Sequence, residues 1–315
     1  MKKLLLIQFL LTAGILMIGA QPVKEHGNLS VKGTDIVDQH GKIVMLQGVS
    51  YGWHNWWPRF YNRESVKWLG DDWGCTVVRA AMGVEPKKGY LDSPDWSKEK
   101  IEAVVAGAIE NDLYVIIDWH SHGIQLDAAR LFFEEMANKY GKYPHVIYEI
   151  FNEPVNDPWS AIKAYSVEVI KSIRKYDPDN IILVGSPHWD QDIHLVADDP
   201  ITGFNNLMYT LHFYAATHGQ FLRDRGNYAL EKGIPLFVSE SAGMAANGDG
   251  PINYEEWQRW IDWMKKNSIS WISWSVADKD ETCSMLYPGA KDEGNWSTQD
   301  MKESGIKTRE LLRKR

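Results

Sequence analysis

Short apolar runs alternate with amphipathic segments along most of the chain. The runs rich in β-branched and aromatic residues predict eight strands, at residues 45–50, 76–81, 114–119, 146–151, 181–185, 207–213, 236–239 and 269–275. The amphipathic segments predict eight helices, at residues 63–70, 95–111, 127–140, 158–176, 190–197, 218–233, 253–267 and 298–312. This alternation predicts an α/β fold, and eight units favour a closed (β/α)8 TIM barrel over an open doubly wound sheet.

The segment before the first predicted strand has a different pattern. Residues 29–46 alternate between apolar and polar positions around the polar stretch at 38–42, which predicts a short N-terminal β-hairpin that closes the bottom of the barrel. The chain shows no internal repeat, low-complexity tract or linker rich in serine, threonine and proline. We therefore expect residues 21–315 to form a single catalytic domain.

The first twenty residues have the three parts of a secretory signal peptide. Two lysines precede an apolar run at residues 4–18, and Gly19-Ala20 follows it. The apolar run is shorter than the roughly 20 residues that a membrane-spanning helix needs, so cleavage is favoured over an uncleaved anchor. We expect residues 1–20 to be removed and the mature chain to be secreted, into the periplasm or the extracellular medium.

Composition and charge narrow the classes of partner. The net charge is −8 and the isoelectric point is about 5.7, whereas a nucleic-acid-binding protein normally carries a basic patch. The ten histidines are scattered, without the spacing of metal ligands. We therefore expect no nucleic-acid partner, no catalytic metal and no cofactor. No protein partner is evident from the sequence, and we expect a monomer.

Polar residues lie where the predicted strands end. Asn152 and Glu153 follow the strand at 146–151, and Glu240 follows the strand at 236–239. In (β/α)8 barrels these C-terminal strand ends form the active-site face. Two glutamates there predict cleavage of a glycosidic bond, which needs one carboxylic acid and one carboxylate. The other strand ends carry Arg79, His120, Trp189, His212, Tyr214 and Trp274. Each residue alone could be a satisfied core residue, but together they are better explained as one site.

Six short segments occur in order at these strand ends. They are VRAAM at 78–82, IDWH at 117–120, IYEIFNEP at 147–154, LHFYA at 211–215, SE at 239–240 and SWS at 273–275. Together they resemble the motifs of glycoside hydrolase family 5, in its bacterial endo-β-1,4-glucanase branch. The resemblance extends from Gln47 to about Leu312. It implies a retaining, double-displacement mechanism in which Glu153 is the general acid/base and Glu240 is the nucleophile.

The resemblance also implies how the two glutamates are tuned. Arg79 and Tyr214 would donate hydrogen bonds that keep Glu240 charged, and Asn152 would bind the sugar 2-hydroxyl. The acid must carry a proton when catalysis begins, so we expect the pKa of Glu153 to lie above that of a free glutamate. A retaining enzyme should hold the two carboxyl groups about 5 to 5.5 Å apart.

The remaining site residues follow from the same resemblance. His120 and His212 would line the cleaved subsite, with His212 tuning the acid, and Trp274 would form the floor under the sugar on the non-reducing side. Glu149 lies four residues before the acid and on the same face of the strand, so we expect it to point into the barrel below the site and to pair with a cation. Further sugar contacts would come from Trp56, Trp189, Lys279 and Glu281.

The predicted function is therefore hydrolysis of internal β-1,4-glucosidic bonds in cellulose or related β-glucans. A β-mannanase, a mixed-linkage glucanase or a xyloglucanase is the alternative within the family, because its members share the catalytic residues and differ in their loops. A catalytically inactive carbohydrate-binding barrel is the alternative from another class, since a fold does not imply a function. The presence of both glutamates and their supporting residues favours the enzyme.

Overall fold

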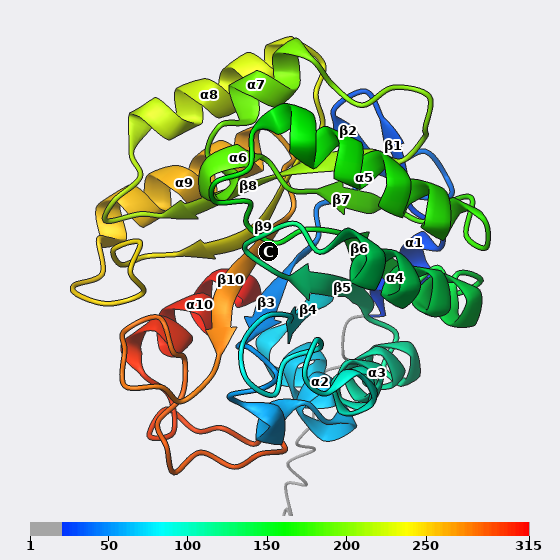
Figure 1. Ribbon diagram of the computed structural model, residues 1–315. Helices are drawn as coiled ribbons and strands as arrows, with labels where there is room; N and C mark the ends of the chain where they lie inside the picture. Colours follow the sequence, from blue (N-terminus) through cyan, green and yellow to red (C-terminus); the bar gives the residue numbers. More distant parts are fainter. Residues whose placement is uncertain (1–20, 315) are drawn as a thin grey trace, which may run out of the picture.

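The computed structural model describes residues 21–314, so the predicted signal peptide lies outside the described residues. Parallel strands close into a barrel in the order β10, β3, β4, β5, β6, β7, β8, β9, with the helices around the outside (Figure 1). These strands are β3 (Gln47–Tyr51), β4 (Val77–Gly83), β5 (Tyr114–His120), β6 (Val146–Glu149), β7 (Ile182–Val184), β8 (Leu207–Tyr214), β9 (Leu236–Ala242) and β10 (Trp271–Val276). The predicted (β/α)8 barrel is confirmed.

The helices correspond to the predicted segments with two differences. They are α2 (Arg63–Trp68), α3 (Pro94–Glu110), α4 (Leu126–Tyr140), α5 (Trp159–Arg174), α6 (Pro187–Asp190), α7 (Ile193–Asp198), α8 (Gln220–Glu231), α9 (Tyr254–Lys266) and α10 (Glu303–Arg313), with a 3-10 turn at Pro58–Phe60 and a π-helical turn at Leu69–Trp73. The helix predicted at 190–197 is divided between α6 and α7. The helix predicted at 298–312 starts later, because Asp300 accepts a hydrogen bond from the Ser297 N–H and closes a turn. Within residues 21–314, none of the helices has the length and apolar character to span a bilayer.

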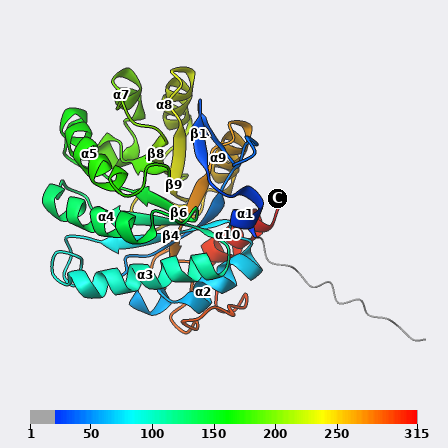
Figure 2. The ribbon, with the colours of Figure 1, turned by 90° about the vertical axis from the view of Figure 1, so that its right-hand side faces the viewer.

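The N-terminal segment closes the end of the barrel where the strands begin (Figure 2). It consists of α1 (Pro22–His26) and an antiparallel hairpin of β1 (Ser30–Lys32) and β2 (Asp35–Val37). The hairpin turns at residues 33–34, and the stretch at 38–42 forms a second turn in which Asp38 accepts two backbone N–H bonds. The segment contributes these buried residues to the lower core of the barrel: Val23, Leu29, Ile36, Val44 and Leu46. The predicted hairpin at the bottom of the barrel is confirmed, although its turn lies at residues 33–34 and not at 38–42.

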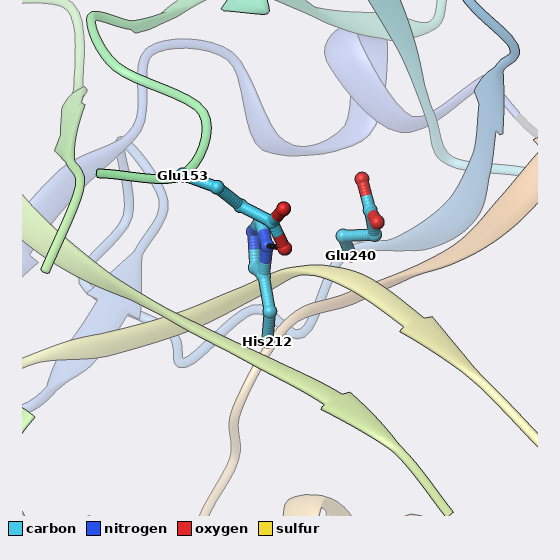
Figure 3. Close-up of side chains that lie close together, drawn as sticks. All are labelled: Glu153, His212 and Glu240. Atoms are coloured by element: carbon cyan, nitrogen blue, oxygen red, sulfur yellow. Dashed lines mark hydrogen bonds and ion pairs between the residues drawn. The ribbon is translucent and has the colours of Figure 1, made fainter. Parts of the chain in front are cut away.

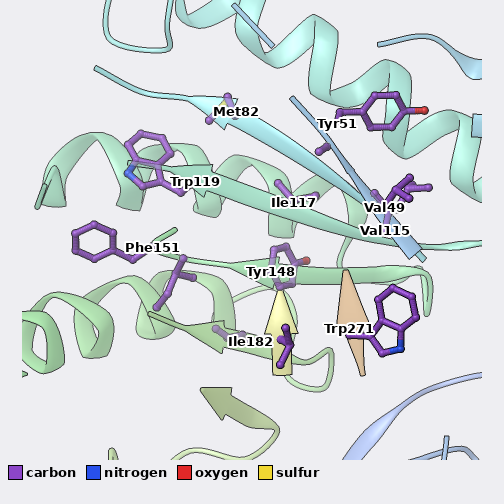
Figure 4. Close-up of a cluster of buried hydrophobic side chains, with 14 of the residues drawn as sticks. Val49, Tyr51, Met82, Val115, Ile117, Trp119, Tyr148, Phe151, Ile182 and Trp271 are labelled. Carbon is purple, nitrogen blue, oxygen red and sulfur yellow. The ribbon is translucent and has the colours of Figure 1, made fainter. Parts of the chain in front are cut away.

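The strands are buried on both faces, and alternation decides which core each residue joins. On β5, Val115 and Ile117 point outward into the large cluster between barrel and helices (Figure 4), whereas Ile116 points into the barrel. Asp118, two residues further on, is also completely buried inside the barrel. The interior is thus apolar near the hairpin and charged near the opposite end, where the candidate site lies.

Candidate active site

The two predicted catalytic glutamates face each other at the C-terminal end of the barrel. Glu153 follows β6, and Glu240 lies near the end of β9. Figure 3 shows the two glutamate side chains next to each other, with the imidazole of His212 beneath the carboxylate of Glu153. One carboxylate oxygen of each glutamate lies within 4.8 Å of the other. An inverting enzyme holds its carboxyl groups about 6.5–9.5 Å apart to admit a water, so the spacing fits the retaining geometry.

The side chain of Glu240 is held by two hydrogen-bond donors. Nη1 of Arg79 lies 3.1 Å from Oε2, and the Tyr214 hydroxyl lies 2.7 Å from Oε1. The structure therefore places both predicted donors beside this residue. Burial and the nearby charge of Glu153 raise the pKa of Glu240, although Arg79 and Tyr214 act in the opposite direction.

Arg79 also connects the glutamate to the barrel interior. Its Nε and Nη2 donate to the two oxygens of Glu149 at 2.7 and 3.1 Å. Glu149 is therefore paired with a cation, as predicted. Nη2 also lies 3.0 Å from Asp118 and donates to Oδ1 of Asn152 at 2.6 Å. All of these side chains are completely buried. One guanidinium thus balances several carboxylates, and Asp118 is a member that sequence reasoning missed.

The Asn152 amide is oriented by that contact. Because Oδ1 accepts from Arg79, the Nδ2 donor points away from the arginine, and it has no hydrogen-bond partner within residues 21–314. A buried donor without a partner is costly, so such a group is explained by a ligand that supplies the acceptor. This arrangement fits the predicted contact with a sugar hydroxyl.

Glu153 interacts with two imidazoles. Nδ1 of His212 lies 2.9 Å from its Oε1, and Nε2 of His122 lies 3.5 Å from its Oε2. Burial favours the neutral acid, but the two histidines outweigh it and lower the pKa of Glu153 to about 2. The prediction that this pKa is raised is therefore wrong for the substrate-free site. That prediction considered what the reaction needs and not the two histidines that surround the carboxylate.

The opposite shift occurs on His212. Burial disfavours its charged form, but Asp190, Glu149 and Glu153 raise its pKa well above the ordinary value. Its Nε2 lies 2.9 Å from the Ser239 hydroxyl and 3.3 Å from Oδ2 of Asp190. In the substrate-free site the proton therefore lies on the imidazole and Glu153 is charged.

An aromatic cavity of about 250 Å³ extends from the glutamates to one side. Its floor is formed by Trp274 and His120, whose rings stack in parallel with centroids 5.1 Å apart. Burial and the charge of Arg79 lower the pKa of His120 well below its ordinary value, so this ring is neutral. The remaining lining includes Trp53, Trp56, Trp57, Lys279 and Glu281. The structure thus brings Trp56, Lys279 and Glu281 together as predicted, and Lys279 forms an ion pair with Glu281.

A second cavity of about 630 Å³ lies beside Glu153 and His212. It is lined by Trp189, which is 40% exposed, together with His188, Gln191, Thr217 and His218. The two cavities share these lining residues: His122, Glu153, Tyr214, Ala246 and Asn247. A chain of sugars that occupies both cavities would therefore place one glycosidic bond beside Glu153. His122 and Asn247 could not be predicted as site residues, because both lie in loops without periodicity.

Glu153, His212 and Glu240 are also the described residues whose spacing would allow them to hold a metal ion. Each already has protein partners: Glu240 binds Arg79, and His212 bridges Glu153 and Ser239. The absence of a catalytic metal stays a prediction.

Comparison with known proteins identifies the family. Residues 37–280 match the family described as Cellulase (glycosyl hydrolase family 5). The chain belongs to glycosyl hydrolase family 5. This hydrolase is 44% identical over 303 residues to endoglucanase N of Pectobacterium atrosepticum, covering 94% of this chain and 68% of the relative. It is equally similar to endoglucanase 5 of Pectobacterium carotovorum subsp. carotovorum, covering 94% of this chain and 59% of that longer protein.

Solved structures of the family agree with the barrel described above. The catalytic domain of Thermobifida fusca endoglucanase Cel5A, solved in a complex with cellotetraose, has a TM-score of 0.88 at 31% identity. The match covers 93% of this family 5 hydrolase and the whole of that chain. The fold, the family and the class of enzyme, a glycoside hydrolase, are thus shown together.

Proposed function

We propose that this family 5 hydrolase is a retaining endo-β-1,4-glucanase that cleaves internal bonds of cellulose or related β-glucans. The observation that carries the proposal is that the carboxylates of Glu153 and Glu240 lie within 4.8 Å of each other, with Glu153 where the two cavities meet and Glu240 in the wall of the aromatic cavity. Cavities on both sides of the scissile bond suit a substrate that continues in both directions. The relatives named as endoglucanases, and the cellotetraose complex of the Thermobifida fusca enzyme, support a β-glucan as the substrate.

In the first step, the proton that His212 holds in the substrate-free site passes to Glu153 across their 2.9 Å contact, and Glu153 gives it to the glycosidic oxygen while the Glu240 carboxylate attacks the anomeric carbon. The bond between carbon and oxygen breaks, and a glycosyl ester forms on Glu240. Arg79 and Tyr214 hold both oxygens of Glu240 before the attack, which orients the nucleophile. The unpaired Nδ2 of Asn152 binds the 2-hydroxyl of the reacting sugar, a contact that strengthens in the transition state.

In the second step, Glu153 acts as a base. The leaving sugar departs through the cavity lined by Trp189, and a water takes its place. Glu153 removes a proton from the water, whose oxygen attacks the anomeric carbon and releases Glu240. Both displacements invert the centre, so the product keeps the β configuration. Glu153 regains the proton that it gave away and returns it to His212, which closes the cycle.

Substrate and stereochemistry can be tested separately. Rates on carboxymethylcellulose, barley glucan, xyloglucan, glucomannan and mannan should be highest on one of the β-glucans, with viscosity falling faster than reducing ends appear. Proton NMR at early times should show the β-anomer of the product. A preference for mannan would contradict the substrate assignment, and an α-anomer would contradict the assignment of Glu153 and Glu240.

We also propose that the protein is secreted and acts as a monomeric domain of residues 21–315. The lysines and apolar run of residues 1–20 support secretion. N-terminal sequencing of protein recovered outside the cytoplasm should begin after Ala20, and sedimentation should give the mass of one chain. Retention of the first twenty residues in a membrane fraction would contradict secretion.

A further inference from the structure

His122 lies where the two cavities meet, and the mechanism above gives it no role. Its side chain is 44% exposed and lines both cavities. Its Nε2 lies 3.5 Å from Oε2 of Glu153, whereas Oε1 of the same carboxylate is taken by Nδ1 of His212. Each oxygen of the acid/base therefore faces a different imidazole.

The two imidazoles are held in different ways. His212 is buried, and its second nitrogen lies 2.9 Å from the Ser239 hydroxyl, so the ring cannot turn without breaking that bond. The ring of His122 instead rests edge-on against Trp53, with centroids 5.5 Å apart, at the wall of the cleft. Oε1 of Glu153 thus contacts a fixed, buried ring, and Oε2 contacts the exposed ring at the wall of the cleft, on the side from which a leaving group can be protonated.

The backbone on both sides of this contact is fixed. The His122 N–H donates to Oε1 of Glu85 at 3.3 Å. The Glu153 N–H donates to the carbonyl of Ser121 at 3.2 Å, which joins the loop after β5 to the acid itself. The loop therefore holds the imidazole next to Oε2 even though the side chain is exposed.

We propose that His122 is a positioning residue for the acid/base. By donating from Nε2 to Oε2 of Glu153, it keeps that oxygen ionised in the substrate-free enzyme. It thereby sets the upper pH limit at which Glu153 can still act as a general acid. This inference rests on the proposed function, because it assigns a partner to the acid of that mechanism.

The surrounding charges agree with this role. Burial disfavours the charged form of His122, but its 3.5 Å contact with the Glu153 carboxylate and the other acidic neighbours raise its pKa. In return, His122 and His212 lower the pKa of Glu153. The titratable groups that face the pair are Glu85, Glu240, His120 and His212. Of the two imidazoles on Glu153, His122 is the exposed one, which can be changed without opening the core.

The test compares the pH dependence of kcat/KM for wild type and H122Q on two substrates. The leaving group of cellotetraose needs a proton, so the alkaline limb of the H122Q profile should move to higher pH by about one unit. That shift is the lower end of the effect that a nearby opposite charge has on a pKa, because the His122 side chain is partly exposed. With 2,4-dinitrophenyl β-cellobioside, whose phenolate leaves without a proton, kcat/KM should stay within about twofold of wild type.

H40Q is the matched control. His40 is an exposed histidine in the turn at residues 38–42, at the end of the barrel opposite the site, so its alkaline limb on cellotetraose should coincide with that of wild type. An unmoved limb in H122Q, an equal loss on both substrates, or the same shift in H40Q would each overturn the inference. If wild type cleaves neither substrate, the proposed function itself fails.

Discussion

Replacing Arg79 by lysine keeps the buried positive charge but removes the planar fork of donors. The guanidinium makes two contacts to Glu149 and one each to Asp118, Asn152 and Glu240, all at 2.6–3.1 Å. A lysine ammonium has three N–H groups, so at least two of these contacts must be lost. Each hydrogen bond to a charged group contributes about 1.5–3 kcal/mol. The expected loss in the free energy of unfolding is therefore about 3–6 kcal/mol.

This loss can be measured by thermal unfolding. For a domain of this size, about 1 kcal/mol corresponds to a change of about 2 °C in Tm, so R79K should unfold about 6–12 °C below wild type. If the bond to Glu240 is among those lost, kcat/KM should also fall by about 10- to 100-fold.

The control is R63K. Arg63 forms an ion pair with Glu110, but both side chains are about half exposed, and such pairs contribute little. Its Tm should stay within about 1 °C of wild type. If R79K unfolds within 2 °C of R63K and keeps full activity, the argument that one guanidinium holds these carboxylates together is refuted.

Four further outcomes follow from the site. E240Q should show no turnover but still bind cellotetraose in calorimetry, and measurable hydrolysis would exclude Glu240 as the nucleophile. W189A should raise KM for cellotetraose about 3- to 10-fold with Tm within about 1 °C, because the ring is 40% exposed and loses stacking rather than packing. The pKa of Glu153 is about 2 in the folded protein, below its ordinary value of 4.5. Its ion pairs therefore stabilise the protein above pH 4.5, and this stabilisation is lost as the pH falls toward 2. Between pH 5 and pH 2.5, the Tm of E153Q should fall less than the Tm of wild type. Dialysis against EDTA should leave kcat/KM unchanged, and a loss that is restored by calcium would contradict a metal-free mechanism.

The sequence predicts the barrel well because its signals are local. Each strand is a short apolar run that ends at a polar residue, so Glu153 and Glu240 could be placed on one face before any distance was known. The buried carboxylates behind them carried no such signal. Asp118 lies inside an apolar strand and Asp190 stood where a helix start was expected, yet both are completely buried beside Arg79 or His212. Contacts between strands far apart in sequence decide their role.

The backbone of the loop that carries Trp189 explains why the helix predicted at 190–197 does not begin at Asp190. His188, Trp189 and Asp190 all have left-handed backbone conformations, with φ of 59°, 55° and 57°, which a helical pattern cannot continue. The Asp190 carboxylate compensates for this strain, because Oδ1 accepts the Ser186 N–H at 2.6 Å and Oδ2 accepts the Thr210 hydroxyl at 2.6 Å. Such strain persists only where surrounding bonds impose it, and it is typical of functional sites. Here the same carboxylate that fixes the loop also lies 3.3 Å from His212. The position of Trp189, a predicted sugar contact, and the raised pKa of His212 are thus tied to one buried aspartate.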